Sequence, residues 1–239
     1  MSDGGKLHGT SLGQIEDIGI DVNSFLKGKG INKPEISVVK EWRSQDRSSA
    51  EGMQNFYTTS SRYIFTLLWL SSAKYPIRDA AAVRAVEVMA GDKEFAILDY
   101  GCGLGNIGFL LASKGYQVTF ADLDTLTFEF IEWRCRKYSI NADFITLPCD
   151  IQKSFDMIIC LEVLEHLRDP KRLLENFSRM LNREGRMIMS ESMGDKSNPL
   201  HVYRKHAGKD VIPIWMGELQ MRPTVFFDIW EMSKRRSEI

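Results

Sequence analysis

The sequence predicts an α/β fold with a doubly wound, mostly parallel sheet, an antiparallel hairpin at one sheet edge and a helical cap at the amino terminus. Two observations carry this prediction. Short apolar runs typical of buried strands lie at 95–100, 116–122, 154–161 and 185–192. Helix-length segments separate them, at 106–114, 126–138 and 170–181. This alternation is typical of right-handed βαβ units, whose helices cover both faces of a parallel sheet.

Three segments are expected along the chain. Residues 1–50 are polar and predict a loosely ordered arm, with one short helix near 13–25. Residues 51–90 have helical periodicity, broken at Tyr75-Pro76, and predict a cap. Residues 91–239 form the core, in which 211–215 and 224–231 are expected to be the two strands of the edge hairpin.

Composition and charge exclude several classes of protein. The 239 residues are 44% hydrophobic, and Lys+Arg 31 nearly cancels Asp+Glu 32, so a role in nucleic-acid binding is not expected. No apolar run reaches the roughly 20 residues of a membrane helix. The first ten residues contain no apolar signal core, and four cysteines without C-x-x-C spacing are typical of reduced thiols, so we expect a cytoplasmic protein.

The sharpest local feature is ILDYGCGLGNIG, in which a strand ends at Asp99 and a helix follows. Gly101, Gly103 and Gly105 occupy alternate positions between them. Residues without Cβ atoms allow a tight turn and close approach of a ligand, and this turn lies where doubly wound sheets bind ligands. The sequence therefore predicts a ligand-binding loop.

Two ligands fit this loop. Gly103-x-Gly105-x-x-Gly108, with Asp122 at the end of the next strand, matches the dinucleotide fingerprint. The pattern that starts at Asp99 includes an acid, which would repel a pyrophosphate but suits the ammonium group of an amino-acid-bearing cofactor. This difference in charge favours the second ligand.

From about Phe95 to Ser192, five ordered segments resemble the Rossmann-like class I S-adenosylmethionine-dependent methyltransferases: the glycine loop, FADLD, LPCDI, SFDMIICLEVLEHLRDP and LLENFSRMLNREGRMIMS. The resemblance implies that Asp122 binds the ribose hydroxyls, Leu123 flanks the adenine and Asp150 contacts the adenine amino group. The other residues expected at the cofactor are Asp99, Gly101, Cys102, Gly103, Gly105, Cys149, Ile151, Leu161, Tyr57 and Tyr63.

Catalytic candidates follow the fourth predicted strand in the run EVLEH. His166 and Glu162 are the candidate catalytic groups. The spacing of Glu162, Glu165 and His166 resembles the metal-binding pattern of small-RNA 2′-O-methyltransferases and some ubiquinone-pathway O-methyltransferases, with His201 as a fourth ligand. Such a set would suit a divalent ion that acidifies an acceptor hydroxyl. Alternatively, the glutamate and histidine bond only to the backbone.

The resemblance implies transfer of a methyl group to an acceptor, expected to be an oxygen of a small molecule or glycan. Three alternatives stay open: a metal-assisted RNA 2′-O-methyltransferase, an NAD(P)-binding oxidoreductase, and a catalytically inactive cofactor-binding partner subunit. The sequence does not determine the acceptor atom or the oligomeric state, and no association with a membrane is expected.

Overall fold

The computed structural model describes residues 17–32, 38–45, 49–74, 76–90, 94–193, 197–203, 208–223 and 229–232. Within these ranges a seven-stranded sheet has the order β3-β2-β1-β4-β5-β7-β6. Its strands are β1 (Ala96–Tyr100), β2 (Gln117–Leu123), β3 (Asp143–Leu147), β4 (Phe155–Leu161), β5 (Leu181–Ser190), β6 (Met221–Pro223) and β7 (Ile229–Met232). The first five are parallel, and β7 pairs antiparallel with both β5 and β6.

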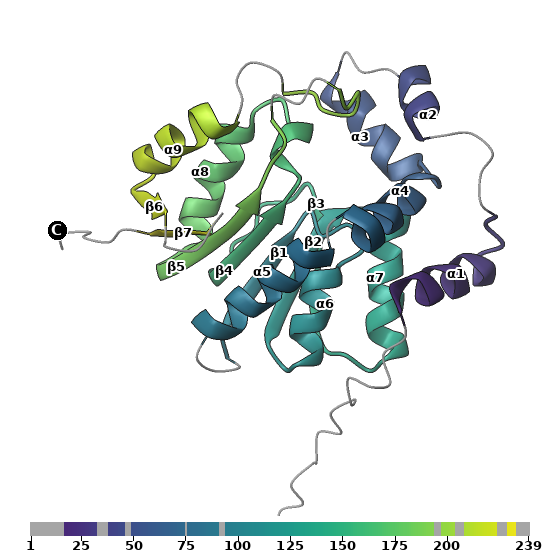
Figure 1. Ribbon diagram of the computed structural model, residues 1–239, viewed down its shortest axis with the longest axis horizontal. Helices are drawn as coiled ribbons and strands as arrows, with labels where there is room; N and C mark the ends of the chain where they lie inside the picture. The colour runs from purple at the N-terminus through teal and green to yellow at the C-terminus, as the bar shows by residue number, and fades with distance from the viewer. Residues whose placement is uncertain are drawn as a thin grey trace, which may run out of the picture.

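Helices cover both faces of the sheet, as Figure 1 shows. On one face α5 (Pro76–Met89), α6 (Asn106–Ser113) and α7 (Leu126–Lys137) bury the larger apolar cluster. On the other face are α8 (Pro170–Met180) and α9 (Gly208–Glu218), which enclose a second cluster. The predicted doubly wound α/β fold is confirmed.

The amino-terminal helices lie beyond the sheet, near the loops that follow the strands (Figure 1). They are α1 (Ile18–Gly28), α2 (Val38–Ser44), α3 (Ala50–Thr59) and α4 (Tyr63–Trp69), and a π-helical turn at Leu70–Lys74 joins α4 to α5. Helix α1 is the short helix expected in the polar arm, whereas α2 was not predicted. The predicted break at Tyr75-Pro76 lies between the π-helical turn and α5.

One predicted strand was wrong, and one strand was missed. Segment 211–215, expected to be a strand, belongs to helix α9, and the edge hairpin is formed by β6 and β7. Of the other strand predicted for this hairpin, 224–231, residues 229–231 belong to β7 and residues 224–228 lie outside the described residues. Val211, Ile212 and Met216 are buried while Ile214 is 59% exposed. A strand would place Ile212, Ile214 and Met216 on the same face, so this burial requires a helix. Strand β3 was not predicted, because its residues are only partly buried and its sequence contains no long apolar run.

A cluster of charged and polar side chains around the buried Asp21 joins α1 to α7. Asp21 is 0% exposed, and it accepts hydrogen bonds from Arg134 Nε at 2.7 Å, Lys137 Nζ at 2.7 Å and Tyr138 Oη at 2.9 Å. The adjoining apolar cluster contains Val22, Ile64 of α4 and Leu104 of the glycine loop, among others. Helix α1 therefore packs α4 against the loop.

Replacing Asp21 by alanine should destabilise the protein by about 3 kcal/mol, because Arg134 would stay buried without its carboxylate. Urea unfolding followed by circular dichroism measures this loss. Asp143→Ala is the matched control, since the Asp143 side chain is 70% exposed where it pairs with Lys153 and should change stability by less than about 1 kcal/mol. Equal stability of the two variants would show that the Asp21 cluster does not stabilise the fold.

Among the described helices, none is both long and apolar enough to cross a bilayer. The four cysteines are unpaired, as the sequence predicts.

Candidate active site

A cleft of about 610 Å³ opens where the parallel strands end. Its volume lies in the range of about 300–1,000 Å³ that small-molecule sites occupy. The glycine loop and the ends of β2 and β4 form one side of the cleft. Helices α2, α3 and α4 and the segment 198–201 contribute the remaining walls. Residues from distant parts of the chain thus meet at a single site.

The glycine loop has a backbone that only glycine adopts easily. Gly101, Gly103 and Gly105 have φ values of +65°, +57° and +66°. A Cβ atom at Gly101 would lie 2.5 Å from Val163 Cγ2, and one at Gly105 would lie 2.5 Å from Ile131 Cγ1. The three glycines therefore allow the loop to adopt left-handed backbone conformations and to pack closely on its neighbours. Without Cβ atoms, the loop also leaves the cleft open.

Asp99 lies under this loop at the end of β1 and lines the cleft. It is 6% exposed, and its Oδ2 accepts a hydrogen bond from the backbone N–H of Gly108 at 3.0 Å. Burial raises the pKa of Asp99 to about 7, and the nearby Asp122 carboxylate contributes to the rise. An acid already occupies one of the amino-terminal N–H groups of α6 that a pyrophosphate would use, so the site disfavours a dinucleotide.

Asp122, at the end of β2, also lines the cleft and binds the loop. Its Oδ2 accepts from the N–H of Gly103 at 2.8 Å, and its Oδ1 accepts from the N–H of Leu123 at 2.7 Å. Burial raises its pKa. Two carboxyl groups with raised pKa values in one cleft favour a ligand that carries positive charge.

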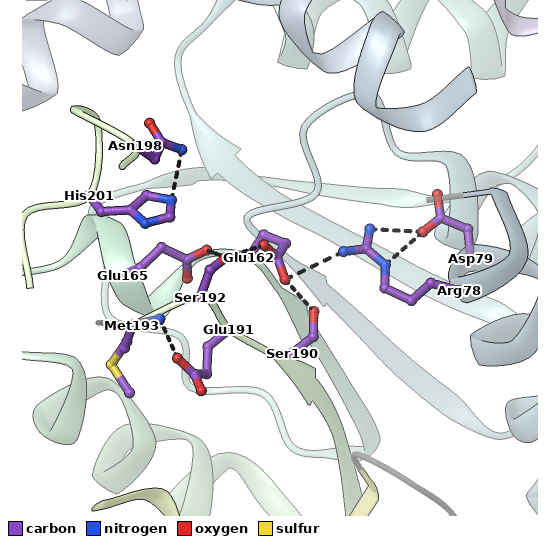
Figure 2. A network of polar contacts seen from close by, with 10 residues as sticks. All are labelled: Arg78, Asp79, Glu162, Glu165, Ser190, Glu191, Ser192, Met193, Asn198 and His201. Atoms are coloured by element: carbon purple, nitrogen blue, oxygen red, sulfur yellow. Dashed lines mark hydrogen bonds and ion pairs between the residues drawn. The ribbon is translucent and has the colours of Figure 1, made fainter. Parts of the chain in front are cut away.

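The acidic groups after β4 form a network with two serines (Figure 2). Ser190 Oγ donates to Glu162 Oε1 at 2.9 Å, and Ser192 Oγ lies 2.5 Å from Glu162 Oε2 and 3.1 Å from Glu165 Oε1. Glu162 has φ +56°, a left-handed conformation that is uncommon outside glycine and asparagine. Such backbone strain is typical of functional sites.

Glu165 and His166 both lie in a 3₁₀ turn, Leu164–His166. Both side chains are mostly uncharged at pH 7. Burial, followed by the Glu162 charge, raises the pKa of Glu165 to about 8. Burial, followed by His201, lowers the pKa of His166 to about 4. His166 is therefore a neutral imidazole at pH 7, the form that can accept a proton or bind a metal ion.

Comparison with known proteins agrees with this geometry. A family model described as "Methyltransferase domain" matches residues 98–187, which include the glycine loop, Asp122 and the EVLEH turn. Residues 98–187 therefore match a methyltransferase domain, in agreement with the predicted resemblance to class I S-adenosylmethionine-dependent methyltransferases. The match removes the support for the oxidoreductase alternative.

Curated relatives match part of the chain. A ubiquinone biosynthesis O-methyltransferase from Coxiella burnetii (strain RSA 493) is 31% identical over 99 residues, which cover 39% of this chain and 42% of that protein. A protein of the same name from Saccharophagus degradans is 27% identical over 122 residues, covering 48% of this chain and 52% of its own. The chain therefore spans about half the length or less of these relatives.

Solved structures share the fold of the methyltransferase domain. The magnesium protoporphyrin IX methyltransferase of Synechocystis PCC 6803, solved with bound S-adenosylmethionine, has a TM-score of 0.54 at 17% identity and covers 91% of this chain and 97% of its own. An S-adenosylmethionine-dependent methyltransferase from Clostridium acetobutylicum has a TM-score of 0.55 at 13% identity, covering 72% of this chain and 97% of its own.

Most residues predicted to bind the cofactor line the cleft of the methyltransferase domain: Tyr57, Tyr63, Asp99, Gly101, Cys102, Gly103, Gly105, Asp122, Leu123 and Leu161. Cys149, Asp150 and Ile151 do not. Cys149 and Asp150 are exposed, and Asp150 accepts a hydrogen bond from Gln152 Nε2. Leu147 and Pro148 line the cleft in their place. The chain turns away after β3, which a linear motif does not reveal.

Three of the four predicted metal ligands lie together. Glu165, His166 and His201 each offer a ligand atom, and these atoms lie within 4.8 Å of one another. Glu162 is outside this group, and its two carboxylate oxygens accept hydrogen bonds from Ser190 and Ser192. The group fits a divalent ion, since Glu165 Oε2 is buried without a hydrogen-bond partner among the described residues. Two imidazoles and a carboxylate are suitable donors for such an ion.

Sequence reasoning missed Arg78, at the start of α5. Its Nη1 lies 3.6 Å from Glu162 Oε1, and its Nη2 donates to Asp79 Oδ1 at 2.8 Å (Figure 2). Asp79 in turn bonds Asn106, the first residue of α6. Arg78 therefore places a positive charge between the glycine loop and Glu162. The Pro76 helix start and the end of the fourth strand were both visible in the sequence, but the packing that brings Arg78 to Glu162 was not.

Proposed function

We propose that the protein is an enzyme that transfers a methyl group from S-adenosylmethionine to an oxygen atom of a small molecule or glycan. The observation that supports this most directly is one cleft that combines a glycine loop flanked by Asp99 and Asp122 with a neutral histidine. The curated relatives, named as O-methyltransferases, support an oxygen acceptor.

The glycine-loop side of the cleft would hold the cofactor. When bound, the cofactor supplies a methyl group activated by its sulfonium charge. Asp99 and Asp122 provide negative charge beside the loop, and Asp122 would accept hydrogen bonds from the ribose hydroxyls. Arg78 provides the positive charge that an α-carboxylate needs. The side chains thus orient the methyl carbon and exclude water from it.

His166 would receive the proton of the acceptor hydroxyl. Its Nδ1 lies 3.1 Å from the carbonyl oxygen of Leu200, and a carbonyl oxygen only accepts hydrogen bonds. Nδ1 therefore carries hydrogen, and the lone pair is on Nε2. A divalent ion bound by Glu165, His166 and His201 would supply an alternative route, since it would acidify the acceptor hydroxyl.

The cleft walls favour a compact acceptor over a nucleic acid. Among the lining residues, five acids (Asp79, Asp99, Asp122, Glu162 and Glu165) exceed three bases (Lys74, Arg78 and Arg168). Since Glu165 is mostly uncharged, the lining carries no positive excess that would attract a phosphate backbone. Val38, Val39, Met53 and Leu200 form an apolar wall opposite the loop. An uncharged, partly apolar molecule with a hydroxyl group fits best.

Calorimetric titration with S-adenosylhomocysteine, NAD and Mg²⁺ in separate experiments tests the proposal. We expect binding of the first and none of the second. Asp122→Ala should weaken S-adenosylhomocysteine binding by about 1–3 kcal/mol, the range for a hydrogen bond to a charged group. Asp143→Ala, which removes an exposed acid at the start of β3, should leave binding unchanged.

Tight NAD binding without S-adenosylhomocysteine binding would overturn the assignment. The acceptor class is tested with methyl-labelled cofactor and a panel of phenols, sugars and short RNAs. Labelling of RNA alone would favour the 2′-O-methyltransferase alternative.

A further inference from the structure

A turn after β5 lines the side of the cleft that contains His166. The segment 198–201 supplies both His201 and the Leu200 carbonyl that binds His166 Nδ1. Within the turn, the backbone N–H of Leu200 donates to Asn198 Oδ1 at 3.0 Å. The N–H groups of Val202 and Tyr203 donate to the carbonyl of Glu165 at 2.9 and 3.1 Å. The turn and the EVLEH loop are therefore one hydrogen-bonded unit.

The contact of this turn with the amino-terminal helices depends on one tryptophan. Trp42 of α2 is 1% exposed, and its Nε1–H donates to the carbonyl oxygen of Pro199 at 2.8 Å. Its ring packs on Phe56 with a centroid distance of 4.8 Å, and the same apolar cluster includes Leu200. Trp42 thus bonds the residue before Leu200 and belongs to the same apolar cluster as Leu200.

The Leu200 carbonyl has a chemical effect on His166, because it determines which ring nitrogen carries hydrogen. Tyr57 Oη also lies 3.0 Å from Nδ1 and could donate to that nitrogen if the carbonyl moved away. The ring would then carry its hydrogen on Nε2, which would be an N–H donor in place of a lone pair. The position of the turn therefore selects between two tautomers.

We propose that Trp42 is a positioning residue for the acceptor side of the site: by holding the Pro199 carbonyl, it keeps the Leu200 carbonyl on His166 Nδ1 and leaves the lone pair on Nε2. Trp42 does not line the cleft itself, so it acts through its neighbours, the turn and the ring of Tyr57, whose centroid lies 6.0 Å from that of Trp42. The expected effect of Trp42 on kcat rests on the proposed methyl transfer, whereas its expected effect on the His166 tautomer does not.

The test is Trp42→Phe, which keeps a ring in the apolar cluster and removes the N–H donor. The histidine tautomers are measured by ¹⁵N NMR of the unliganded protein, and His166→Gln identifies the His166 signals. We expect Nδ1–H in the wild type and a shift toward Nε2–H in the variant. We also expect kcat to fall on the order of tenfold, since small displacements at a reacting group reduce rate strongly, with unchanged affinity for S-adenosylhomocysteine.

Trp133→Phe is the matched control, because Trp133 packs with Phe25 and Phe130 in a different cluster. It should change neither tautomer nor kcat. If Trp42→Phe fails to fold, a benzothienylalanine at position 42 keeps the indole shape without the N–H and gives the same test. An Nε2–H tautomer in the wild type, or an unchanged His166 spectrum in the variant, would overturn the proposal. Because the tautomer is measured without substrate, its failure is distinguishable from failure of the proposed function.

Discussion

Replacing His166 by glutamine should lower the rate of methyl transfer by about 10²- to 10⁴-fold, the usual contribution of a positioned acid or base. The neutral imidazole, with a pKa lowered to about 4, is available to accept a proton across the whole physiological range. Glutamine fills part of the same volume but does not accept a proton at neutral pH. Measurement of kcat and KM for both substrates checks this result.

The affinity for S-adenosylhomocysteine should be unchanged in this variant, because His166 faces the acceptor side of the cleft. The same fall in kcat with a parallel loss of cofactor affinity would indicate a collapsed cleft. A kcat equal to that of the wild type would show that His166 is a structural histidine and that the acceptor ionises without it.

Cofactor affinity should fall about tenfold as the pH is lowered from 8 to 6. In the unliganded protein the pKa of Asp99 is about 7, compared with an ordinary value of 3.8. A cationic ligand favours the charged carboxylate, so binding lowers this pKa and releases a proton when Asp99 starts out protonated. For a single group with a pKa near 7, this linkage gives about a tenfold change between pH 8 and pH 6.

The same shift has the opposite consequence for the unliganded fold. Since the folded pKa lies above the unfolded value, the stability that Asp99 contributes is present below pH 3.8 and is lost as the pH rises through about 7. Ligand binding and stability should therefore respond to pH in opposite directions.

Calorimetry of S-adenosylhomocysteine binding in buffers of different ionisation enthalpy measures the proton release directly. At pH 7 we expect about half a proton from Asp99. Glu165, with a pKa of about 8, titrates in the same range, so Asp99→Asn is needed to isolate the effect. That variant should bind more weakly at pH 8 and lose the pH dependence. A pH dependence that survives in Asp99→Asn would assign it to another group.

The predicted helices that follow the strands were close to correct because their signals are local. Helix α6 begins at Asn106 and α8 at Pro170, as expected. Thr125 caps α7 by accepting from the N–H of Phe128 at 3.0 Å, and proline begins α8. Caps and proline starts act over three or four residues, so a sequence shows them directly.

The errors occurred where packing outweighs local preference. The run VIPIW of α9 is rich in β-branched residues, which favour a strand, yet contact with α8 and the sheet requires a helical face. The role of Asp150 at the cofactor stays a prediction from a motif, and its side chain is exposed and does not line the cleft.

The sequence by itself determined the α/β class, the glycine loop and the two acids that flank it, because glycine conformation and strand-end position depend on neighbouring residues. Only the tertiary structure decided which residues form the side of the cleft opposite the glycine loop. Trp42 and Pro199, which share a hydrogen bond, are 157 residues apart, and Arg78 approaches Glu162 from another helix. Such contacts follow from the packing of whole layers, which brings together residues whose spacing in the chain has no fixed period.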